Sequence, residues 1–330
     1  MNTFAGMSLF PVVYSTLSAD ALLERLIKAY HLEAGTGILF LKRGFNDTYL
    51  ITEKGRKYIL RVYKYKWRNL EDVQAELDLL QYLQKNDVCV SVPLPDASNN
   101  YIQTISAPEG NRYAVLFSFA EGKQVKKLSP EQSFQLGVEA GNLHLLTENR
   151  KWNATSKDYS IEKQFENCIR VLTPVLVDYP GQFNFLMELS RLFQNEFKNI
   201  NRGELAKGIC HGDLQSENFH ITADNRFVFF DFDFSGTGYL IYDIGVFMWY
   251  DHKNKPLAIR NAFLDGYESK RKLSKTERRL IPWFSTLRAI FQMTMYCELS
   301  DGKQLPLWPS QQVADFVNKI EKWSEGLSSN

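Results

Sequence analysis

The sequence predicts an α+β protein with a strand-rich N-terminal lobe and a helix-rich C-terminal lobe. The chain has 330 residues, of which 44% are hydrophobic. A single core usually stops growing near ~250–300 residues, so two lobes are expected. β-branched and aromatic runs fill most of the first 120 residues, and helical patterns dominate from Ser129 onward. Because strands and helices are segregated rather than alternating, the layout is α+β and not a series of βαβ units.

Five strands and one inserted helix are expected in the N-terminal lobe. The runs ILFLKRG, DTYLITEKG and RKYILRVYKY predict an antiparallel meander, because glycine-containing turns separate them. A helix is expected from about Asn69 to Lys85. Its apolar residues at helical spacing are Val73, Leu77, Leu80 and Leu83. Two further strands, YIQTIS and RYAVLFSF, follow the turn-rich segment SVPLPDASNN.

Helix-start signals mark the C-terminal lobe. Ser129 and Gln132 form a capping-box pattern around a proline at the first helical position, and this helix is expected to end near His144. The ranges 160–200 and 253–330 also have mostly helical patterns.

One strand-like segment, residues 208–233, interrupts the helical patterns with the runs ICH, FHIT and RFVFFDF. The segment 119–122 connects the two lobes. We therefore expect an N-terminal domain over residues 1–118 and a C-terminal domain over residues 119–330.

Charge and cysteine content narrow the class of protein. A net charge of +1 and a pI near 7.6 argue against a dedicated nucleic-acid or membrane-surface binder. The four cysteines lie far apart without a CxxC pair, which favours reduced thiols in the cytoplasm over a disulfide framework or a zinc site. No Lys or Arg precedes Arg25 and no run approaches ~18 apolar residues, so neither a signal peptide nor a membrane span is expected.

The segment HGDLQSEN, from His211 to Asn218, has the spacing H-x-D-x-x-x-x-N. Taken alone it is also compatible with a capped turn in which Asp213 and Asn218 bond nearby backbone groups. The apolar run FVFF that follows ends at Asp231, a carboxylate that would be costly to bury without a partner. Two loops that carry oxygen ligands at the ends of buried strands are typical of a Mg²⁺–phosphate site.

HGDLQSEN followed by FDFDFSGTGYLIYD resembles the phosphotransferase family that includes aminoglycoside phosphotransferases, choline kinases and bacterial homoserine-kinase-like enzymes. Tyr242-Asp243-Ile244 supplies the last element of the family pattern. By layout the resemblance covers nearly the whole chain, and it is specific across residues 210–245. It implies a bilobal protein-kinase-like fold, ATP and Mg²⁺ as cofactors, and transfer to a hydroxyl of a small molecule.

The resemblance also assigns roles within the two loops. Asp213 matches the catalytic aspartate that orients or deprotonates the acceptor hydroxyl. Asn218 and Asp231 match the two metal ligands. Asp243 matches a buried aspartate that braces the catalytic loop.

The roles expected of two further polar residues are less specific. The imidazole of His211 fits a structural role, since it can bind neighbouring backbone. Asp233 fits either a residue that supports the metal ligands or a solvated loop acid.

Arg61 and Glu76 are expected to form an ion pair. Strand alternation puts Ile59 and Arg61 on one face of their strand. Glu76 lies on the apolar face of the next helix, where a carboxylate needs a partner, and Arg61 is the nearest candidate. In the family resemblance Arg61 occupies the position of a nucleotide-binding lysine, so an arginine there departs from the commonest pattern.

Two other segments are expected to contact the nucleotide. Gly44, with the side chains of Asn46 and Thr48, lies where related folds cover the phosphates, although no G-x-G-x-x-G occurs and a plain hairpin is the alternative. The residues Ser118-Phe119-Ala120 are the expected hinge that offers backbone groups to adenine.

Two other functions compete with that of a kinase. The stretch KGRKYILRVYKYKWR interleaves basic residues with Tyr58, Tyr63, Tyr65 and Trp67, a composition also found in nucleic-acid binders. The near-neutral chain favours a solvated strand pair with snorkelling lysines instead, and no nucleic-acid partner is expected. A catalytically inactive scaffold of the same fold is kept as an alternative because Arg61 replaces lysine.

The acceptor is the least defined part of the function. Homoserine-like, choline-like and aminoglycoside-like acceptors are all compatible with the motifs. Glu298 and Asp301 are possible anchors for a cationic amine, and solvated loop acids are the alternative interpretation.

Overall fold

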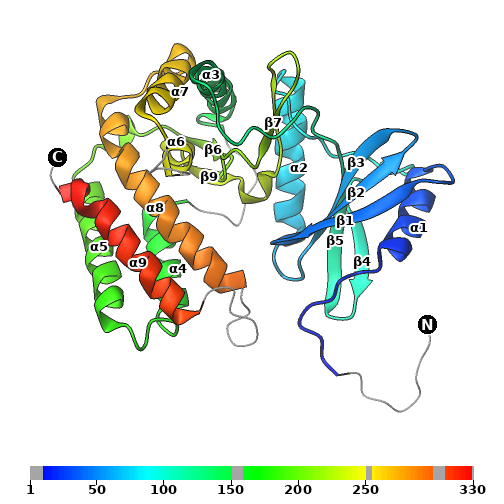
Figure 1. The fold of residues 1–330 in the computed structure, drawn as a ribbon, viewed down its shortest axis with the longest axis horizontal. Coiled ribbons are helices and arrows are strands. Elements are labelled where there is room, and N and C mark those ends of the chain that lie inside the picture. Colours follow the sequence, from blue (N-terminus) through cyan, green and yellow to red (C-terminus); the bar gives the residue numbers. More distant parts are fainter. Residues whose placement is uncertain (1–9, 151–158, 250–254, 300–308, 329–330) are drawn as a thin grey trace. The chain divides into compact units, whose positions relative to one another are not determined.

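The computed structural model describes residues 10–150, 159–249, 255–299 and 309–328 (Figure 1). The chain divides into two compact units. Unit 1 comprises Met1–Gln84 and Val90–Ala120, and unit 2 comprises Lys85–Cys89 and Glu121–Asn330. The four cysteines are free thiols.

Unit 1 is built on a five-stranded antiparallel sheet with the strand order β1-β2-β3-β5-β4. The strands are β1 (Gly37–Arg43), β2 (Asn46–Glu53), β3 (Arg56–Tyr63), β4 (Gln103–Ala107) and β5 (Gly110–Ser118), and helix α2 (Leu70–Lys85) is inserted after β3. The expected meander, inserted helix and final strand pair are thus confirmed.

The two faces of this sheet have different coverings. Tyr49, Leu60 and Leu116 pack with Leu22 and Leu26 of helix α1 (Ala19–Tyr30) in one buried cluster. Helix α1 is an addition to the elements expected from the sequence. Its apolar pattern in the sequence is short, because only Leu22 and Leu26 are buried. Ser18 caps the start of the helix. The opposite face carries Arg61, since side chains alternate along a strand.

Unit 2 contains the helices and two short strand pairs. The helices are α3 (Pro130–Thr147), α4 (Ile161–Leu172), α5 (Pro180–Lys198), α6 (Ile241–Trp249), α7 (Leu257–Lys270), α8 (Lys275–Leu299) and α9 (Ser310–Ser324). The strands are β6 (Lys207–Cys210), β7 (Phe219–Ile221), β8 (Phe227–Phe229) and β9 (Gly236–Tyr239), paired as β6-β9 and β7-β8. The glycine-rich β9 is a second addition to the expected elements. No described helix is long and apolar enough to cross a membrane.

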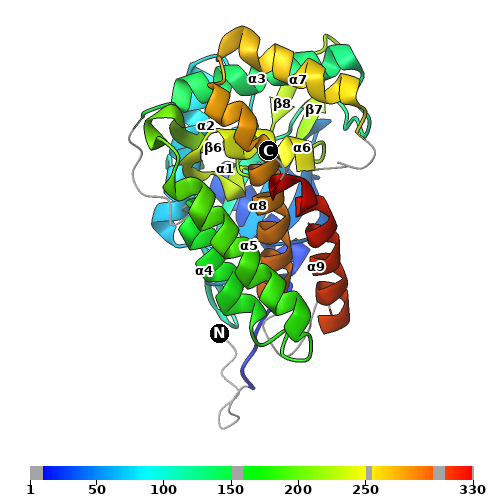
Figure 2. The same ribbon diagram turned by 90° about the vertical axis from the view of Figure 1, so that its left-hand side faces the viewer.

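Helices α3 and α7 lie side by side (Figure 2), and the residues that meet across the pair advance along both helices together, so the helices run parallel. The Ser133 hydroxyl donates to the Ile259 carbonyl at 2.7 Å, and Gly137 lies against Phe263. A Cβ atom at Gly137 would come within 2.0 Å of the Phe263 carbonyl oxygen, so only glycine allows this approach. Both helices therefore begin at the same end of the pair.

The short strands position the two motif loops. Strand β6 ends at Cys210, directly before His211, and β7 begins at Phe219, directly after Asn218. Strand β8 ends two residues before Asp231. The HGDLQSEN segment, called the catalytic loop below, is therefore held at both ends by sheet pairing.

Candidate active site

Asp243 at the start of α6 holds the beginning of the catalytic loop. Its carboxylate accepts the backbone N–H of His211 at 2.6 Å and that of Gly212 at 2.8 Å. Gly212 has φ +80°, and a Cβ there would meet the Phe234 carbonyl oxygen at 2.0 Å. This turn requires glycine. Asp243 thus makes the contacts that a brace of this loop needs.

A buried polar chain continues from Asp243 into the helices. His144 Nε2 lies 3.0 Å from Asp243 Oδ2, and His144 Nδ1 lies 2.8 Å from the Tyr267 hydroxyl. His144 and Asp243 are each 1% exposed, so their polar atoms depend on each other for hydrogen bonds. The catalytic loop is therefore tied to α3 and α7 through one carboxylate.

His211 ties the same loop to the strand that leads to Asp231. The Asp213 backbone N–H donates to His211 Nδ1 at 3.3 Å, so Nδ1 is unprotonated. Nε2 then carries the proton and donates to the Phe230 carbonyl at 3.2 Å. The imidazole is neutral in this arrangement and makes the backbone contact expected of a structural histidine.

Asp213 is buried and bonded at both carboxylate oxygens. Its Oδ2 accepts from Asn218 Nδ2 at 2.7 Å and from Gln215 Nε2 at 3.0 Å. Its Oδ1 accepts from Arg288 Nη2. Because three donors fix it, the carboxylate is pre-oriented before any substrate arrives.

Arg288 on α8 is a site residue that the motifs do not reveal. It is 4% exposed, and its Nη1 also donates to the Gly212 carbonyl at 3.3 Å. The sequence carries one signal, namely a lone arginine inside the apolar run LRAIF. A charge at such a position requires a buried partner, but only the fold shows that the partner is Asp213.

The two expected metal ligands lie on adjacent backbone segments. The Phe230 backbone N–H donates to the Asn218 carbonyl at 3.0 Å, which places Asp231 next to Asn218. Asp231 is half-buried and has left-handed backbone, with φ 63° and ψ 56°. Asn218 uses its amide nitrogen to bond Asp213, so Oδ1 is the atom that would bind a metal.

This donor set fits Mg²⁺. Mg²⁺ binds one or two protein oxygens and completes its shell with phosphate oxygens and water. Within the described ranges no group of three His, Cys, Asp or Glu side chains is placed to hold a metal. Asp233, which follows closely, is only 4% exposed, so it is not a solvated loop acid.

In unit 1, Arg61 and Glu76 form the expected ion pair. Arg61 Nη1 lies 2.6 Å from Glu76 Oε1, with side-chain exposures of 10% and 5%. The Tyr63 hydroxyl donates to Glu76 Oε2 at 2.8 Å. The Arg61 guanidinium also lies 4.9 Å from the Phe117 ring centroid. The pairing is confirmed, and contact with a nucleotide stays a prediction.

Thr48 and Asn46 lie on the same sheet face as Arg61. Thr48 is the direct strand partner of Arg61, and Asn46 is the partner of Tyr63. Gly44 lies in the tight β1–β2 connection, where its N–H donates to the Asn46 carbonyl at 3.0 Å. The backbone of this segment is therefore a hairpin. The Asn46 and Thr48 side chains of the hairpin lie on the same sheet face as Arg61.

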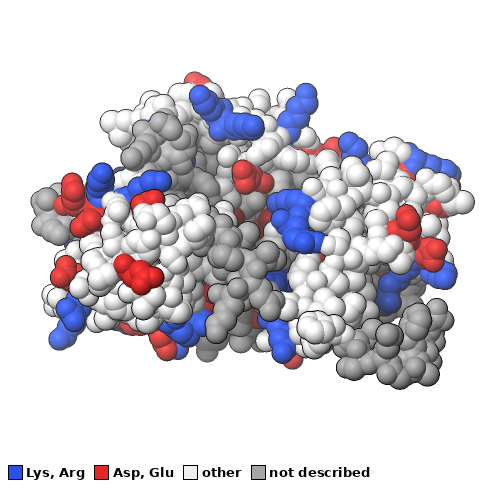
Figure 3. All heavy atoms as spheres, turned by 60° about the horizontal axis from the view of Figure 1, so that its bottom comes forward, with Lys and Arg blue, Asp and Glu red and all other residues white. Residues whose placement is uncertain are grey.

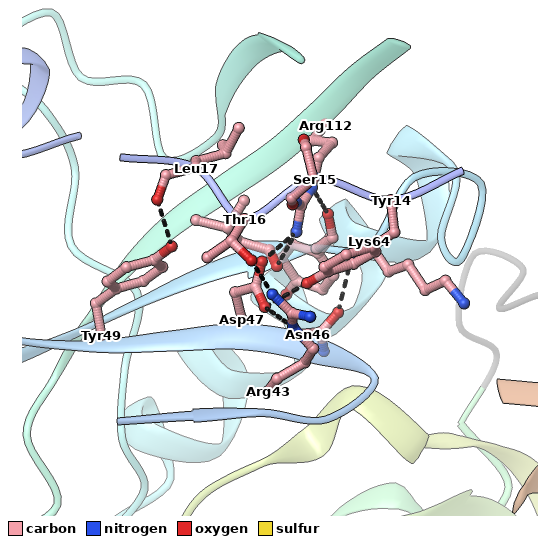
Figure 4. Close-up of polar contacts among 12 residues, drawn as sticks. Tyr14, Ser15, Thr16, Leu17, Arg43, Asn46, Asp47, Tyr49, Lys64 and Arg112 are labelled. Atoms are coloured by element: carbon pink, nitrogen blue, oxygen red, sulfur yellow. Dashed lines mark hydrogen bonds and ion pairs between the residues drawn. The ribbon is translucent and has the colours of Figure 1, made fainter. Parts of the chain in front are cut away.

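The N-terminal segment 14–17 is fastened to this hairpin (Figure 4). Asp47 is fully buried and accepts from Arg112 Nη2 at 2.9 Å and from the Tyr14 hydroxyl. Arg112 Nη1 donates to the Ser15 carbonyl at 3.0 Å. Burial, and then the bond to Asp47, raise the pKa of Tyr14 to about 12, so the phenol is a proton donor at neutral pH. The motifs do not reveal this cluster.

Both backbone polar groups of Ser118, the first residue of the expected hinge, are already hydrogen-bonded within unit 1. The Ser118 N–H donates to the Val92 carbonyl at 2.8 Å, and the Ser118 carbonyl accepts from the Ser91 hydroxyl at 2.6 Å. Phe119 and Ala120 are the last residues of unit 1, and a contact of this segment with adenine stays a prediction.

The structure does not show Glu298 and Asp301 as two unpaired acids that could bind a cationic acceptor. Glu298 lies 2.7 Å from Arg170 in a surface ion pair. Asp301 lies outside the described residues.

Part of the basic and aromatic stretch packs inside unit 1, whereas Lys54, Arg56, Lys57 and Lys66 are exposed. Tyr63 and Arg61 are both buried against Glu76, and Trp67 stacks on Phe45 with centroids 4.7 Å apart. On the face drawn in Figure 3, basic and acidic side chains are interspersed. Neither observation marks a continuous nucleic-acid surface.

Comparisons with known proteins show the family to which this chain belongs. The model of the phosphotransferase enzyme family matches residues 38–283. An uncharacterized protein from Synechocystis sp. is 32% identical over 309 residues, which cover 92% of this chain and 85% of that protein. A homoserine kinase from Rhizobium meliloti is 26% identical, covering 82% of this chain and 81% of that enzyme.

Solved structures give the same assignment of fold. An amicoumacin kinase in complex with AMP-PNP, Ca²⁺ and Ami has a TM-score of 0.75 at 21% identity, covering 93% of this chain and 94% of that chain. A microcompartment-associated aminopropanol kinase has a TM-score of 0.69 at 18% identity, covering 94% and 98%. The expected α+β protein-kinase-like fold is confirmed, and this chain belongs to the phosphotransferase enzyme family.

Proposed function

We propose that this protein is an ATP- and Mg²⁺-dependent kinase that phosphorylates a hydroxyl group of a small molecule. The observation that carries the proposal is the environment of Asp213, a buried carboxylate bonded at both oxygens. A carboxylate fixed in this way can orient an acceptor hydroxyl and take its proton during transfer.

The remaining roles follow from charge and donor type. Asn218 and Asp231 would hold Mg²⁺, which neutralises phosphate charge when bound. Arg61 would contact the nucleotide phosphates while Glu76 and Phe117 fix its guanidinium. An arginine can bond a carboxylate and a phosphate at once, so its replacement of lysine is compatible with activity.

Homoserine-like hydroxylated amino acids are the first acceptors to test. Several named relatives are homoserine kinases that match more than 80% of this chain. The amicoumacin kinase, at 21% identity, supports the fold alone. Because Glu298 is paired with Arg170, the described residues offer less support for a polycationic antibiotic.

A coupled ADP-release assay tests the proposal. The full chain with ATP and Mg²⁺ is screened against homoserine and other hydroxylated amino acids, then amino alcohols, sugars and aminoglycosides. We expect acceptor-dependent ADP release that EDTA abolishes and Asp213→Asn removes. Parallel reactions with GTP show whether the nucleotide preference is for ATP.

The inactive-scaffold alternative predicts a different outcome. Calorimetric titration would show MgATP binding, yet neither ADP release with any acceptor nor slow ATP hydrolysis would exceed that of Asp213→Asn. That combination would replace the kinase proposal with a nucleotide-binding scaffold.

A further inference from the structure

A pocket of about 310 Å³ lies beside the catalytic loop, entirely within unit 2. Gln215 and Ser216 of the catalytic loop form part of its wall. Lys126, Lys127 and Lys255 also line it, and none of its ten described lining residues is acidic. The three lysines give the pocket a positive potential that favours an anion.

The lysines come from two chain segments that meet at this pocket. Lys126 and Lys127 are exposed and precede α3, whereas Lys255 precedes α7. Lys255 Nζ lies 3.6 Å from the Phe247 ring centroid and donates to the Phe247 carbonyl at 2.5 Å. These contacts hold the Lys255 ammonium group at the pocket wall.

The two parallel helices add to the positive field. Helix α3 begins at Pro130 and α7 begins at Leu257, each within three residues of a lining lysine. A helix N-terminus carries a partial positive charge that favours anions. This contribution supports the lysines, which remain the main argument.

The rest of the wall is apolar and the volume exceeds that of a bare ion. Leu128, Phe219, Phe247 and Ile259 contribute hydrophobic surface. Cavities of roughly 300 Å³ and above hold small organic molecules. Lysine binds phosphate oxygens as a point charge, and three ammonium groups match the two negative charges of a phosphate monoester better than the single charge of a carboxylate.

We propose that this lysine pocket is a binding site for a small organic phosphate, separate from the residues assigned to the nucleotide and the metal. The phosphate lies among Lys126, Lys127 and Lys255, and the organic part lies against the apolar wall. Gln215 lines the pocket and donates to Asp213 Oδ2 at 3.0 Å. A bound ligand therefore lies one side chain away from the proposed catalytic carboxylate.

Calorimetric titration of the full chain tests the site without any turnover. The probes are phenyl phosphate and inorganic phosphate, titrated without nucleotide and at constant ionic strength. We expect saturable binding, tighter for phenyl phosphate because its ring covers apolar wall. Lys126→Gln with Lys127→Gln should weaken phenyl phosphate binding by about tenfold or more.

A matched control removes the same charge elsewhere in unit 2. Lys319 and Lys322 are exposed on α9, and Lys319→Gln with Lys322→Gln should leave binding unchanged. The proposal is overturned by the absence of saturable binding, or by equal losses in both double variants. Loss of phenyl phosphate binding in Asp231→Ala would also overturn it, because the probe would then occupy the nucleotide site.

A third probe separates the two sources of such a ligand. Glycerol phosphate has free hydroxyls, so ADP release with it under MgATP would show that the bound phosphate belongs to the acceptor. Binding without ADP release would show that the ligand is a separate effector. Both outcomes support the site, and because binding is measured directly, failure of the kinase proposal leaves this test intact.

Discussion

Arg61 on β3 and Glu76 on α2 form a buried ion pair with 2.6 Å between Nη1 and Oε1. Tyr63, two residues along the same strand face, bonds the other carboxylate oxygen of Glu76. One carboxylate thus fixes two side chains of β3, and the pair joins the strand to the inserted helix. This arrangement makes the contribution of Arg61 to catalysis depend on Glu76.

We predict that Arg61→Met and Glu76→Gln each lower kcat/KM for ATP by about tenfold or more. Because both residues act through one contact, the double variant should be little worse than the worse single variant. Tyr63→Phe keeps the ring and serves as the control with a small effect. Strictly additive losses in the double-mutant cycle would show that Arg61 and Glu76 act independently.

Asp213→Asn should reduce phosphoryl transfer by about 10²–10⁴-fold, the usual range for loss of a general base. Asparagine keeps the side-chain volume beside Arg288, so the fold and the affinity for MgATP should change little. Turnover is measured with the acceptor found by ADP release, and affinity by calorimetry. Full activity in this variant would remove Asp213 from the mechanism.

Asn218→Ala and Asp231→Ala should weaken MgATP binding far more than Asp213→Asn does. Both side chains are proposed to hold the metal, and losing either leaves phosphate charge poorly neutralised. Titrations with MgATP, repeated with ATP and EDTA, measure the metal-dependent part of the affinity. Equal affinities in all three variants would contradict this division of roles.

Arg288→Lys should lower kcat by about tenfold while KM for ATP stays unchanged. Lysine keeps the charge but lacks the fork that reaches both Asp213 Oδ1 and the Gly212 carbonyl. Arg288→Met should be worse and less stable, since it leaves Asp213 in a buried site without its cation. A purely structural role would instead give equal kcat values for Arg288→Lys and wild type at matched stability.

Arg112→Met should destabilise unit 1 by about 3–5 kcal/mol, the usual cost of removing one partner of a buried pair. Arg112 and Asp47 are both fully buried at their side chains. Hydrogen exchange of the β2 and β3 amides measures the effect locally. Arg43→Met is the control, because the Arg43 side chain is 50% exposed and lies 3.7 Å from Asp47, so we expect its loss to cost less than about 1 kcal/mol. Equal protection in both variants would show that the Asp47–Arg112 pair does not hold this sheet.

Local patterns in the sequence were sufficient for the sheet of unit 1, the capped helix α3 and the pairing of Arg61 with Glu76. Each of these depends on periodicity or on the need of a buried charge for a partner, and both are visible within a few residues. Helix α1 and strand β9 have weak local patterns. Helix α1 buries only two residues, and half of the residues in β9 are glycine. Their formation depends on the surfaces that they cover or pair with.

The sequence by itself determined the family, the α+β layout and the positions of Asp213, Asn218 and Asp231 in two loops. Only the tertiary structure showed that Arg288, 75 residues after Asp213, bonds its carboxylate, and that Asp47 pairs with Arg112. It alone brought Lys126, Lys127 and Lys255 to one pocket. Motif spacing records contacts within a loop, whereas contacts between distant segments depend on how helices and strands pack, and no local pattern contains that information.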